Sequence, residues 1–260
     1  MAASVEESVR GHIGTERGRE WLTVGAGGDR TAMIDRVAED AVIAHCEALQ
    51  AQGLRFLLRS EELGDREFGA RQPVLLVDPV DGSINAKQGL PYHCTSLALL
   101  DGETFGDTVA GVVRDLSGPG TYTAVRGGGA WRDGARIEPL TVALVDGRIP
   151  VLIIEALLRP ALLANHAALL DASVRTRLFG AAALSLCQAA TGAASAFFAP
   201  AGLRAFDCAA GLLILDEAGA VVSDREGRSI ADVNATMQSR VGVVASRSRE
   251  VHDKVLSLLH

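Results

Sequence analysis

Two short apolar runs in the first third of the sequence each lead directly into acidic residues. Leu54 to Arg59 is followed by Glu61 and Glu62, and Val74 to Val77 is followed at once by Asp78. Apolar runs of this length are typical of buried strands. The sequence therefore predicts buried strands that end in carboxylates. Such a fold places acidic side chains at the edge of a sheet, where they can take part in binding or catalysis.

The rest of the first half predicts one helix and an antiparallel sheet. Residues Ile34 to Leu49 have apolar side chains at helical spacing, with Thr31 as the expected N-cap and Asp35 in the first turn. Further strands are expected along the chain, joined by Asp101-Gly102 and by glycine-rich turns. These strands are Thr95 to Leu100, Val109 to Val113 and Tyr122 to Val125.

The pattern changes near Thr141, after which strands and helices alternate. We expect residues 1–145 to form an α+β half with an antiparallel sheet, and residues 146–260 an α/β half that completes one compact unit. Ala181 to Pro200 contains polar and small residues, so a buried helix followed by a strand explains it better than a membrane span. Ala156 to Leu170 fits either a core helix or part of a subunit interface.

Composition limits the classes of partner. The 260 residues are 48% hydrophobic and 22% charged, which allows a sizeable core. A net charge of −7 gives no general attraction to nucleic acid or to an anionic membrane, so a phosphate group would need a local site. The four cysteines are isolated in apolar stretches and are expected to be buried and reduced. The acidic amino terminus does not fit a secretory signal, so a cytoplasmic enzyme is expected.

The densest polar motif is the turn Asp78-Pro79-Val80-Asp81-Gly82-Ser83. Its two carboxylates flank a proline that stiffens the exit from a buried strand. Mg²⁺ is held in proteins by a few carboxylates together with water and phosphate oxygens. The N–H groups of Gly82 and Ser83 would then face an anion such as phosphate. The simpler alternative is a solvated acidic turn in which Ser83 caps a helix.

Three more acidic residues occur at similar places. Glu61 ends a strand, Asp35 begins a helix, and Asp207 begins the late apolar helix Phe206-Asp207-Cys208-Ala209-Ala210-Gly211. Each has an ordinary explanation as a strand-end or helix N-terminal carboxylate. Their occurrence together with the Asp78 to Ser83 turn is much more specific than any one of them, because few protein families combine all of these segments in this order.

Together these segments resemble the inositol monophosphatase and fructose-1,6-bisphosphatase superfamily. The resemblance runs in order from about Gly27 to Asp224 and includes Gly128-Gly129-Ala130-Trp131. Within the superfamily, the chain looks most similar to archaeal-type enzymes that act on both inositol and fructose phosphates. The segments that carry this closer likeness are Gly28-Asp29-Arg30-Thr31 with Ile34-Asp35, and Phe179-Gly180-Ala181-Ala182-Ala183-Leu184.

The resemblance implies an α+β fold, layered as an α/β/α/β/α sandwich, and two or three Mg²⁺ ions, with Mn²⁺ as an alternative. Glu61, Asp78 and the carbonyl of Val80 would hold one ion. Asp78, Asp81 and Asp207 would hold a second, and a weaker third would lie near Asp35. A water between Glu61 and Ser83 would be the nucleophile, and Asp35 would accept a hydrogen bond from Ser83. The resemblance therefore assigns catalytic roles to Asp35, Glu61 and Ser83, and Asp29 could touch a metal or its water.

The expected phosphate cradle consists of Gly82 and Ser83 together with Gly180, Ala181 and Ala182. Inositol-specific relatives carry a glutamate where this chain has Pro200, so the best marker of inositol preference is missing. Three arginines near the expected cleft could instead meet a second phosphate, or they could be solvated surface residues. These are Arg175, Arg177 and Arg204.

The sequence thus predicts a magnesium-dependent phosphatase that hydrolyses a small sugar or inositol phosphate, namely fructose 1,6-bisphosphate, inositol 1-phosphate or both. Two alternatives stay open: a nucleotidase acting on adenosine 3′,5′-bisphosphate, and a non-catalytic regulatory module on the same fold. Neither nucleic acid nor a membrane is expected as a partner. The resemblance also implies a homodimer.

Overall fold

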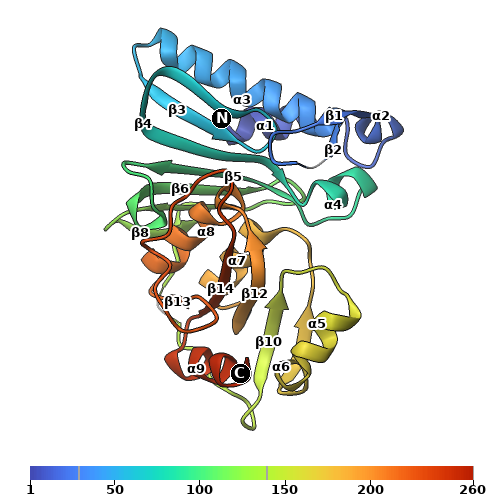
Figure 1. Ribbon diagram of the computed structural model, residues 1–260, viewed down its shortest axis with the longest axis vertical. Helices are drawn as coiled ribbons and strands as arrows, with labels where there is room; N and C mark the ends of the chain where they lie inside the picture. The colour runs from blue at the N-terminus through green and yellow to red at the C-terminus, as the bar shows by residue number, and fades with distance from the viewer. Residues whose placement is uncertain (29, 139, 260) are drawn as a thin grey trace.

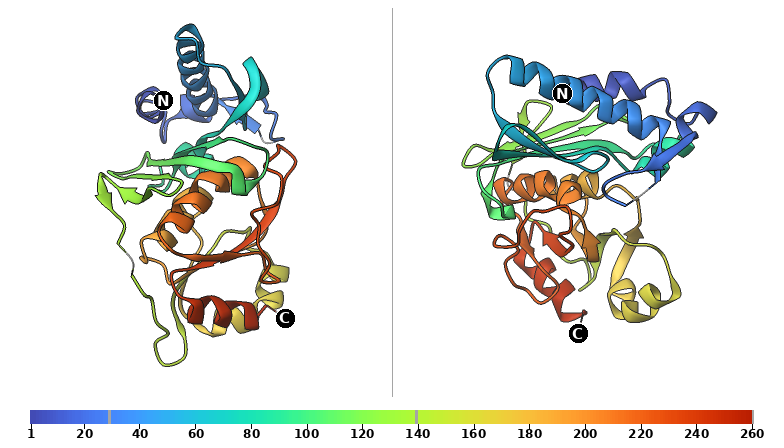
Figure 2. Two further views of the ribbon diagram at one scale, coloured as in Figure 1. Left: turned by 90° about the vertical axis from the view of Figure 1, so that its left-hand side faces the viewer. Right: turned by 45° about the horizontal axis from the view of Figure 1, so that its top comes forward.

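The computed structural model describes residues 1–28, 30–138 and 140–259. Five layers are stacked from top to bottom in Figure 1: helices, a seven-stranded sheet, two helices, a five-stranded sheet and a last layer of helices. Figure 2 shows the same order of layers from two further directions. The expected α+β fold, an α/β/α/β/α sandwich, is confirmed.

The amino-terminal third forms the outer helical layer and a small hairpin. Helix α3, Met33–Ala51, lies along the sheet and contacts helix α1, Ala2–Val9. Apolar side chains of α1 and α3, such as Val5, Ile34 and Val42, pack against the outer face of the sheet. The remaining elements are α2, Glu16–Arg19, and the hairpin of β1, Trp21–Val24, with β2, Arg30–Ala32.

The seven-stranded sheet has the order β3-β4-β5-β6-β7-β8-β9. Beyond β3 its neighbouring strands are antiparallel, as the turns between them predict. Helix α4, Ser83–Gln88, leaves this sheet at the end of β4. The strands are β3, Phe56–Ser60; β4, Gly64–Asp81; β5, Cys94–Leu100; β6, Thr108–Asp115; β7, Thr121–Val125; β8, Gly129–Arg132; and β9, Ala135–Arg136, with a short 3-10 turn, η1, at Phe105–Asp107.

Strand β4 is longer than the expected run Val74 to Val77. Its first part folds back beside β3, with Gly64 opposite Ser60, and its second part runs parallel to β3, with Val74 opposite Leu57. The second part is paired on its other side with β5. This arrangement buries the residues that lead into the Asp78 turn and fixes its position.

The five-stranded sheet has the order β11-β10-β12-β14-β13 and mixes parallel and antiparallel pairs. Helix α9 covers its outer face, and the short helices α5 and α6 lie beside its β11 edge. Its strands are β10, Ile149–Ile154; β11, Ser173–Arg177; β12, Ala196–Leu203; β13, Val221–Ser223; and β14, Val241–Ser246. The helices of this half are α5, Pro160–Asn165; α6, Ala167–Asp171; α7, Ala182–Ala190; α8, Ala205–Glu217; and α9, Arg249–Ser257.

Helices α7 and α8 lie between the two sheets (Figure 1). Every residue of α8 from Ala205 to Leu215 is buried, because the helix has protein on all sides. Two glycines allow the close packing. A Cβ on Gly111 of β6 would lie 3.0 Å from the carbonyl oxygen of Ala210, and one on Gly211 would lie 2.8 Å from the side chain of Leu186.

Most expected elements are confirmed, with two differences besides the greater length of β4. The N-cap of α3 is Ala32 rather than Thr31, because the Thr31 hydroxyl donates instead to the carboxylate of Glu62. The segment from Ala156 to Leu170 forms two short helices rather than one core helix, and Leu157 and Leu158 are 72% and 64% exposed.

Two other expectations hold. All four cysteines are buried and free. The segment Ala181 to Pro200 is a buried helix followed by a strand, as expected. Within the described ranges, no helix combines the length and apolar character that crossing a bilayer requires.

A candidate active site between the two sheets

The turn after β4 is fixed by hydrogen bonds to its two carboxylates. The Val80 N–H donates to Asp78 Oδ1 at 3.0 Å. The Ala183 N–H, in the first turn of α7, donates to Asp81 Oδ2 at 2.7 Å. Asp78 and Asp81 are 1% and 8% exposed, so both carboxylates are held inside the protein. The turn therefore joins the seven-stranded sheet to the helical layer between the sheets.

Gly82 is required where the turn meets the segment before α7. Its φ is +81°, and a Cβ at this position would lie 2.9 Å from the carbonyl oxygen of Tyr92 and 3.0 Å from the Cβ of Ala181. Asn85 holds the same junction, because its Nδ2 donates to the carbonyl oxygens of Tyr92 and Phe179 at 2.8 and 2.7 Å. The structure thus brings Gly82 beside Gly180 and Ala181, which the sequence assigned to one phosphate cradle.

Asp207 and Glu61 reach the same place from two other elements. Asp207 lies in the first turn of α8 and accepts the N–H of Arg204 at 3.0 Å. Glu61 follows β3 and is 8% exposed. The guanidinium of Arg204 links them, with 2.6 Å from Nη1 to Glu61 Oε1 and 3.2 Å from Nε to Asp207 Oδ2. Carboxylates from β3, β4 and α8 therefore meet in one buried cluster, which we call the carboxylate cluster: Glu61, Asp78, Asp81 and Asp207.

Burial and nearby negative charges raise the pKa values of Glu61, Asp78 and Asp81 in this cluster. Burial raises the pKa of Glu61 to about 8, although Arg204 acts in the opposite direction. The pKa of Asp78 lies well above its ordinary value because of burial and then the charge of Glu61. The pKa of Asp81 is also well above its ordinary value, through burial and the charge of Asp207. Such a cluster has more negative charge than one guanidinium neutralises, so it favours added cations.

The oxygen atoms present fit a hard divalent cation. Asp78 Oδ2 is buried, and no described residue donates a hydrogen bond to it. Carboxylate oxygens that face one another without donors are the ligands that Mg²⁺ takes in proteins. In the described ranges, no three His, Cys, Asp or Glu side chains are already arranged as a metal site. Two of the four carboxylates, Glu61 and Asp207, are instead paired with the guanidinium of Arg204.

The surroundings of Asp35 differ from the expectation. Asp35 is 3% exposed, and its Oδ2 accepts the Ala32 N–H at 2.8 Å. The expected hydrogen bond from Ser83 is replaced by an ion pair with Lys87, whose Nζ lies 2.7 Å from Asp35 Oδ2. The same ammonium donates to Ser83 Oγ at 3.4 Å. Lys87 therefore lies between the two residues that the sequence placed in direct contact.

The loop between β1 and β2 lies beside the carboxylate cluster. The Gly27 N–H donates to the carbonyl oxygen of Glu61 at 2.7 Å, and the Ala26 N–H donates to that of Glu62 at 2.9 Å. This agrees with the expectation that the glycine-rich segment lies near the acidic residues. Asp29, expected to touch a metal or its water, lies outside the described residues.

The expected substrate arginines lie in two different environments. Arg204 is 19% exposed and belongs to the carboxylate cluster region. Arg175 and Arg177 are exposed on β11, the edge strand of the five-stranded sheet. Arg177 is opposite Ile153 of β10 and comes three residues before Gly180, so it lies nearer the phosphate cradle than Arg175 does. Their roles toward substrate stay predictions.

Two residues of the site were missed by the sequence reasoning. Glu155 follows β10, and its carboxylate accepts the Gly180 N–H at 3.1 Å and the Ser185 hydroxyl at 2.6 Å. Like Glu61 and Asp78, it directly follows an apolar strand, and this sequence pattern could have identified it as a site residue. Lys87 follows Ser83 by four residues, which places both on one face of a helix.

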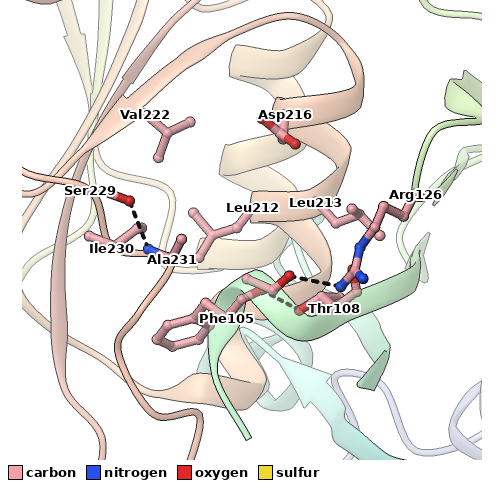
Figure 3. Close-up of a pocket in the computed structure, with 11 residues that line it drawn as sticks. Phe105, Thr108, Arg126, Leu212, Leu213, Asp216, Val222, Ser229, Ile230 and Ala231 are labelled. Atoms are coloured by element: carbon pink, nitrogen blue, oxygen red, sulfur yellow. Dashed lines mark hydrogen bonds between the residues drawn. The ribbon is translucent and has the colours of Figure 1, made fainter. Parts of the chain in front are cut away.

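A cavity of about 370 Å³ lies apart from the carboxylate cluster, beside the later turns of α8 (Figure 3). It is lined mainly by apolar side chains such as Phe105, Leu212 and Ile230. Its Arg126 donates to the backbone carbonyl oxygens of Gly106 and Thr108. These donors are used within the protein. Among the described residues that line the cavity, Asp216 is the one carboxylate, so a metal ion fits the four-carboxylate cluster better.

The chain is similar to known proteins along nearly its whole length. A fructose-1,6-bisphosphatase/inositol-1-monophosphatase of Archaeoglobus fulgidus is 31% identical, covering 100% of this chain and 95% of that protein. A bifunctional NADP phosphatase/NAD kinase of Methanococcus maripaludis is 29% identical over 99% of this chain, which spans 48% of that longer protein. A Pyrococcus horikoshii structure, described as a hypothetical protein with similarities for inositol-1 monophosphatase, superimposes with a TM-score of 0.83 at 25% identity and covers 99% of this chain and 94% of its own.

A profile of the inositol monophosphatase family matches residues 2–260. The match includes every element that contributes to the carboxylate cluster and to the phosphate cradle. The chain belongs to the inositol monophosphatase family.

Proposed function

We propose that the protein is a magnesium-dependent phosphatase that hydrolyses a small sugar or inositol phosphate with water as the nucleophile. The observation that carries this proposal is the convergence of four buried carboxylates from separate elements, with Asp78 Oδ2 lacking any donor among the described residues. The family is generally metal-dependent, which supports the same reading. Mn²⁺ would fit the same oxygen ligands.

The cluster would hold the metal ions through Glu61, Asp78, Asp81 and Asp207, with the carbonyl of Val80 as a further ligand. When bound, Mg²⁺ would activate water and neutralise charge on the phosphoryl oxygens. The chain's own residues orient the substrate. The backbone N–H groups of Gly82 and Ser83 would suit a phosphate oxygen. Gly180 and Ala181 lie beside Gly82, and the Gly180 N–H donates to Glu155.

The substrate proposal is fructose 1,6-bisphosphate, inositol 1-phosphate or both. It rests on similarity to the fructose-1,6-bisphosphatase/inositol-1-monophosphatase of Archaeoglobus fulgidus and on the expected phosphate cradle. Pro200 supplies no carboxylate that could bind the hydroxyl groups of an inositol ring. Arg177 is exposed and comes three residues before Gly180, and a cation there would favour a substrate with a second phosphate. A charged hydrogen bond of this kind contributes about 1.5 to 3 kcal/mol when it is well formed.

The experiment is phosphate release from a panel of substrates, with Mg²⁺, with Mn²⁺ and with a chelator. The panel contains fructose 1,6-bisphosphate, inositol 1-phosphate, adenosine 3′,5′-bisphosphate and NADP, so that the sugar, nucleotide and dinucleotide readings are separated. We expect metal-dependent release from fructose 1,6-bisphosphate, from inositol 1-phosphate or from both. Release from none of the four would contradict the proposal and favour the non-catalytic module, and preferential release from either nucleotide would reassign the substrate.

We also propose a homodimer in which the segment from Ala156 to Leu170 takes part. Leu157, Leu158 and Leu163 are 72%, 64% and 46% exposed on this segment, and neighbouring apolar side chains of this kind favour burial against a partner. Light scattering would measure the mass in solution. A dimer that becomes a monomer in Leu157→Asp supports the assignment, and a monomeric parent contradicts it.

A further inference from the structure

The ion pair between Lys87 and Asp35 points to a role that the family resemblance does not assign. We propose that the ammonium of Lys87 is a protein-supplied cation that takes the place of a divalent metal beside Asp35. This inference rests on the proposed function, because it concerns how many metal ions the site holds. It predicts that divalent ions bind only at the carboxylate cluster and that Asp35 is not one of their ligands.

The position of the ammonium is fixed by its own helix. Lys87 and Ser83 lie on one face of α4, which begins after Gly82 and ends at Gly89, where the φ of +75° stops the helix. The carbonyl oxygen of Lys87 accepts a hydrogen bond from Arg19 Nε at 2.6 Å. The backbone of Lys87 is therefore held from the amino-terminal segment as well as from α4.

Burial and distance distinguish this pair from an ordinary surface ion pair. The Lys87 and Asp35 side chains are 17% and 4% exposed, and Nζ lies 2.7 Å from Oδ2. The other oxygen, Asp35 Oδ1, is buried and receives no hydrogen bond from the described residues. An ammonium is a compact positive charge with three hydrogen-bond donors. Here it contacts the Asp35 carboxylate and the Ser83 hydroxyl, the two groups that a metal ion and its bound waters would otherwise connect.

Two consequences follow for the chemistry. A divalent ion close to Asp35 would repel the ammonium strongly, because two positive charges a few ångströms apart in a buried site are poorly screened. Ser83 Oγ accepts a hydrogen bond from Lys87, so its hydroxyl proton can be directed toward the phosphate cradle instead of toward Asp35. Lys87 is thus a positioning residue for Ser83.

The sequence offers a close control. Lys87 and Lys254 are the chain's lysines, and Lys254 lies in the carboxy-terminal helix α9, away from the site. Lys254→Met removes the same charge and leaves the cluster untouched. Lys87→Met keeps the aliphatic stem and removes the ammonium, and Lys87→Arg keeps a positive charge.

The test counts bound Mn²⁺ per chain by electron paramagnetic resonance of the free ion, with no substrate present. We expect the parent, Lys254→Met and Lys87→Arg to bind the same number, and Lys87→Met to bind one more. In the double variant Lys87→Met with Asp35→Asn, the extra ion should be lost. An unchanged count in folded Lys87→Met overturns the inference.

Asp35→Asn alone keeps the inference testable if Lys87→Met does not fold. Its count should equal that of the parent, because Lys87 and not a metal faces Asp35. Loss of a bound ion in this variant would overturn the inference. A parent that binds no Mn²⁺ contradicts the proposed function instead, so the two failures are distinguishable.

Discussion

The carboxylate cluster and the β11 edge of the five-stranded sheet form two contrasting regions beside the same cradle. In the cluster, Asp78 and Asp81 are buried and held by backbone N–H groups. On the edge, Arg175 and Arg177 are exposed, and their Nη1 atoms donate to the carbonyl oxygens of the preceding residues in the chain. The cluster is therefore preorganised, whereas the edge is free to rearrange around a ligand.

This difference indicates a division of tasks. Under the proposed function, the chemistry that needs fixed charge would be located in the carboxylate cluster, where three elements meet between two sheets. Discrimination among substrates is better located on exposed side chains, which can differ without disturbing the core. Arg204 tests the division, because the sequence grouped it with the edge arginines while the structure places its guanidinium against Glu61 and Asp207.

The largest effect is expected in the cluster, from Asp81→Asn. The change keeps size but removes a charge needed to hold divalent metal, so activity should fall by at least about a hundredfold at saturating Mg²⁺. The metal-free variant should unfold at the same or a higher temperature than the parent, because burial and the charge of Asp207 disfavour an ionised Asp81. Steady-state rates and thermal unfolding check both. Parent-like turnover would remove Asp81 from the metal site.

The next effect concerns Ser83→Ala, which removes a hydroxyl and leaves all four carboxylates in place. We expect kcat to fall by about tenfold to a hundredfold, while KM changes less, since metals and backbone N–H groups would hold the phosphate. Initial rates over a range of substrate concentration measure the two constants. A higher KM with the parental kcat would assign Ser83 to binding alone.

A smaller, selective effect separates the arginines. Arg177→Ala should lower kcat/KM for fructose 1,6-bisphosphate by about tenfold and leave inositol 1-phosphate nearly unchanged. Arg175→Ala should act in the same direction but less, because it lies farther from Gly180 along β11.

Arg204→Ala is the contrasting variant for both edge arginines. It removes a cation that competes for Glu61 and Asp207, so the Mg²⁺ concentration for half-maximal activity should fall. Mg²⁺ titrations and rates on both substrates compare the three variants. If Arg204→Ala affected only the bisphosphate and left the Mg²⁺ response unchanged, it would belong with the edge arginines, as the sequence suggested.

The smallest effect is the pH dependence of stability without metal. Burial raises the pKa of Glu61 to about 8 and of Glu39 to about 7, from ordinary values of 4.5. Each protonated group therefore stabilises the fold fully below about pH 4.5, and this contribution is lost as the pH rises toward 8 or 7. The slope is at most about 1.4 kcal/mol per pH unit for each proton.

Mg²⁺ should distinguish the two glutamates. Bound Mg²⁺ should remove the part of the pH dependence of the unfolding free energy that comes from Glu61, because Glu61 is a proposed metal ligand. The part that belongs to Glu39, which accepts a hydrogen bond from Ser60, should persist and disappear in Glu39→Gln. Urea unfolding between pH 5 and 8, with and without Mg²⁺, measures this. A slope that Mg²⁺ leaves unchanged would separate Glu61 from the metal.

Local chemistry made much of the fold and site predictable. Apolar runs located most strands, and positive-φ glycines at Gly192 and Gly219 end α7 and α8 as expected. Residue types alone single out the turn from Asp78 to Ser83, because its paired carboxylates flank a stiffening proline. They leave a solvated acidic turn as an alternative, and the metal-binding interpretation comes from the family resemblance. The domain boundary near residue 145 stays a prediction, although β9 ends at Arg136 and β10 begins at Ile149.

The sequence by itself determined which residue types stand at strand ends and helix starts, because hydrophobic periodicity and turn chemistry are local properties. Only the tertiary structure decided which of them pair. Lys87 lies between Asp35 and Ser83, and Arg204 lies between Glu61 and Asp207, in both cases because packing brings distant elements together. A long cationic side chain can reach several carboxylates, and its choice is set by burial and distance, which no local pattern encodes.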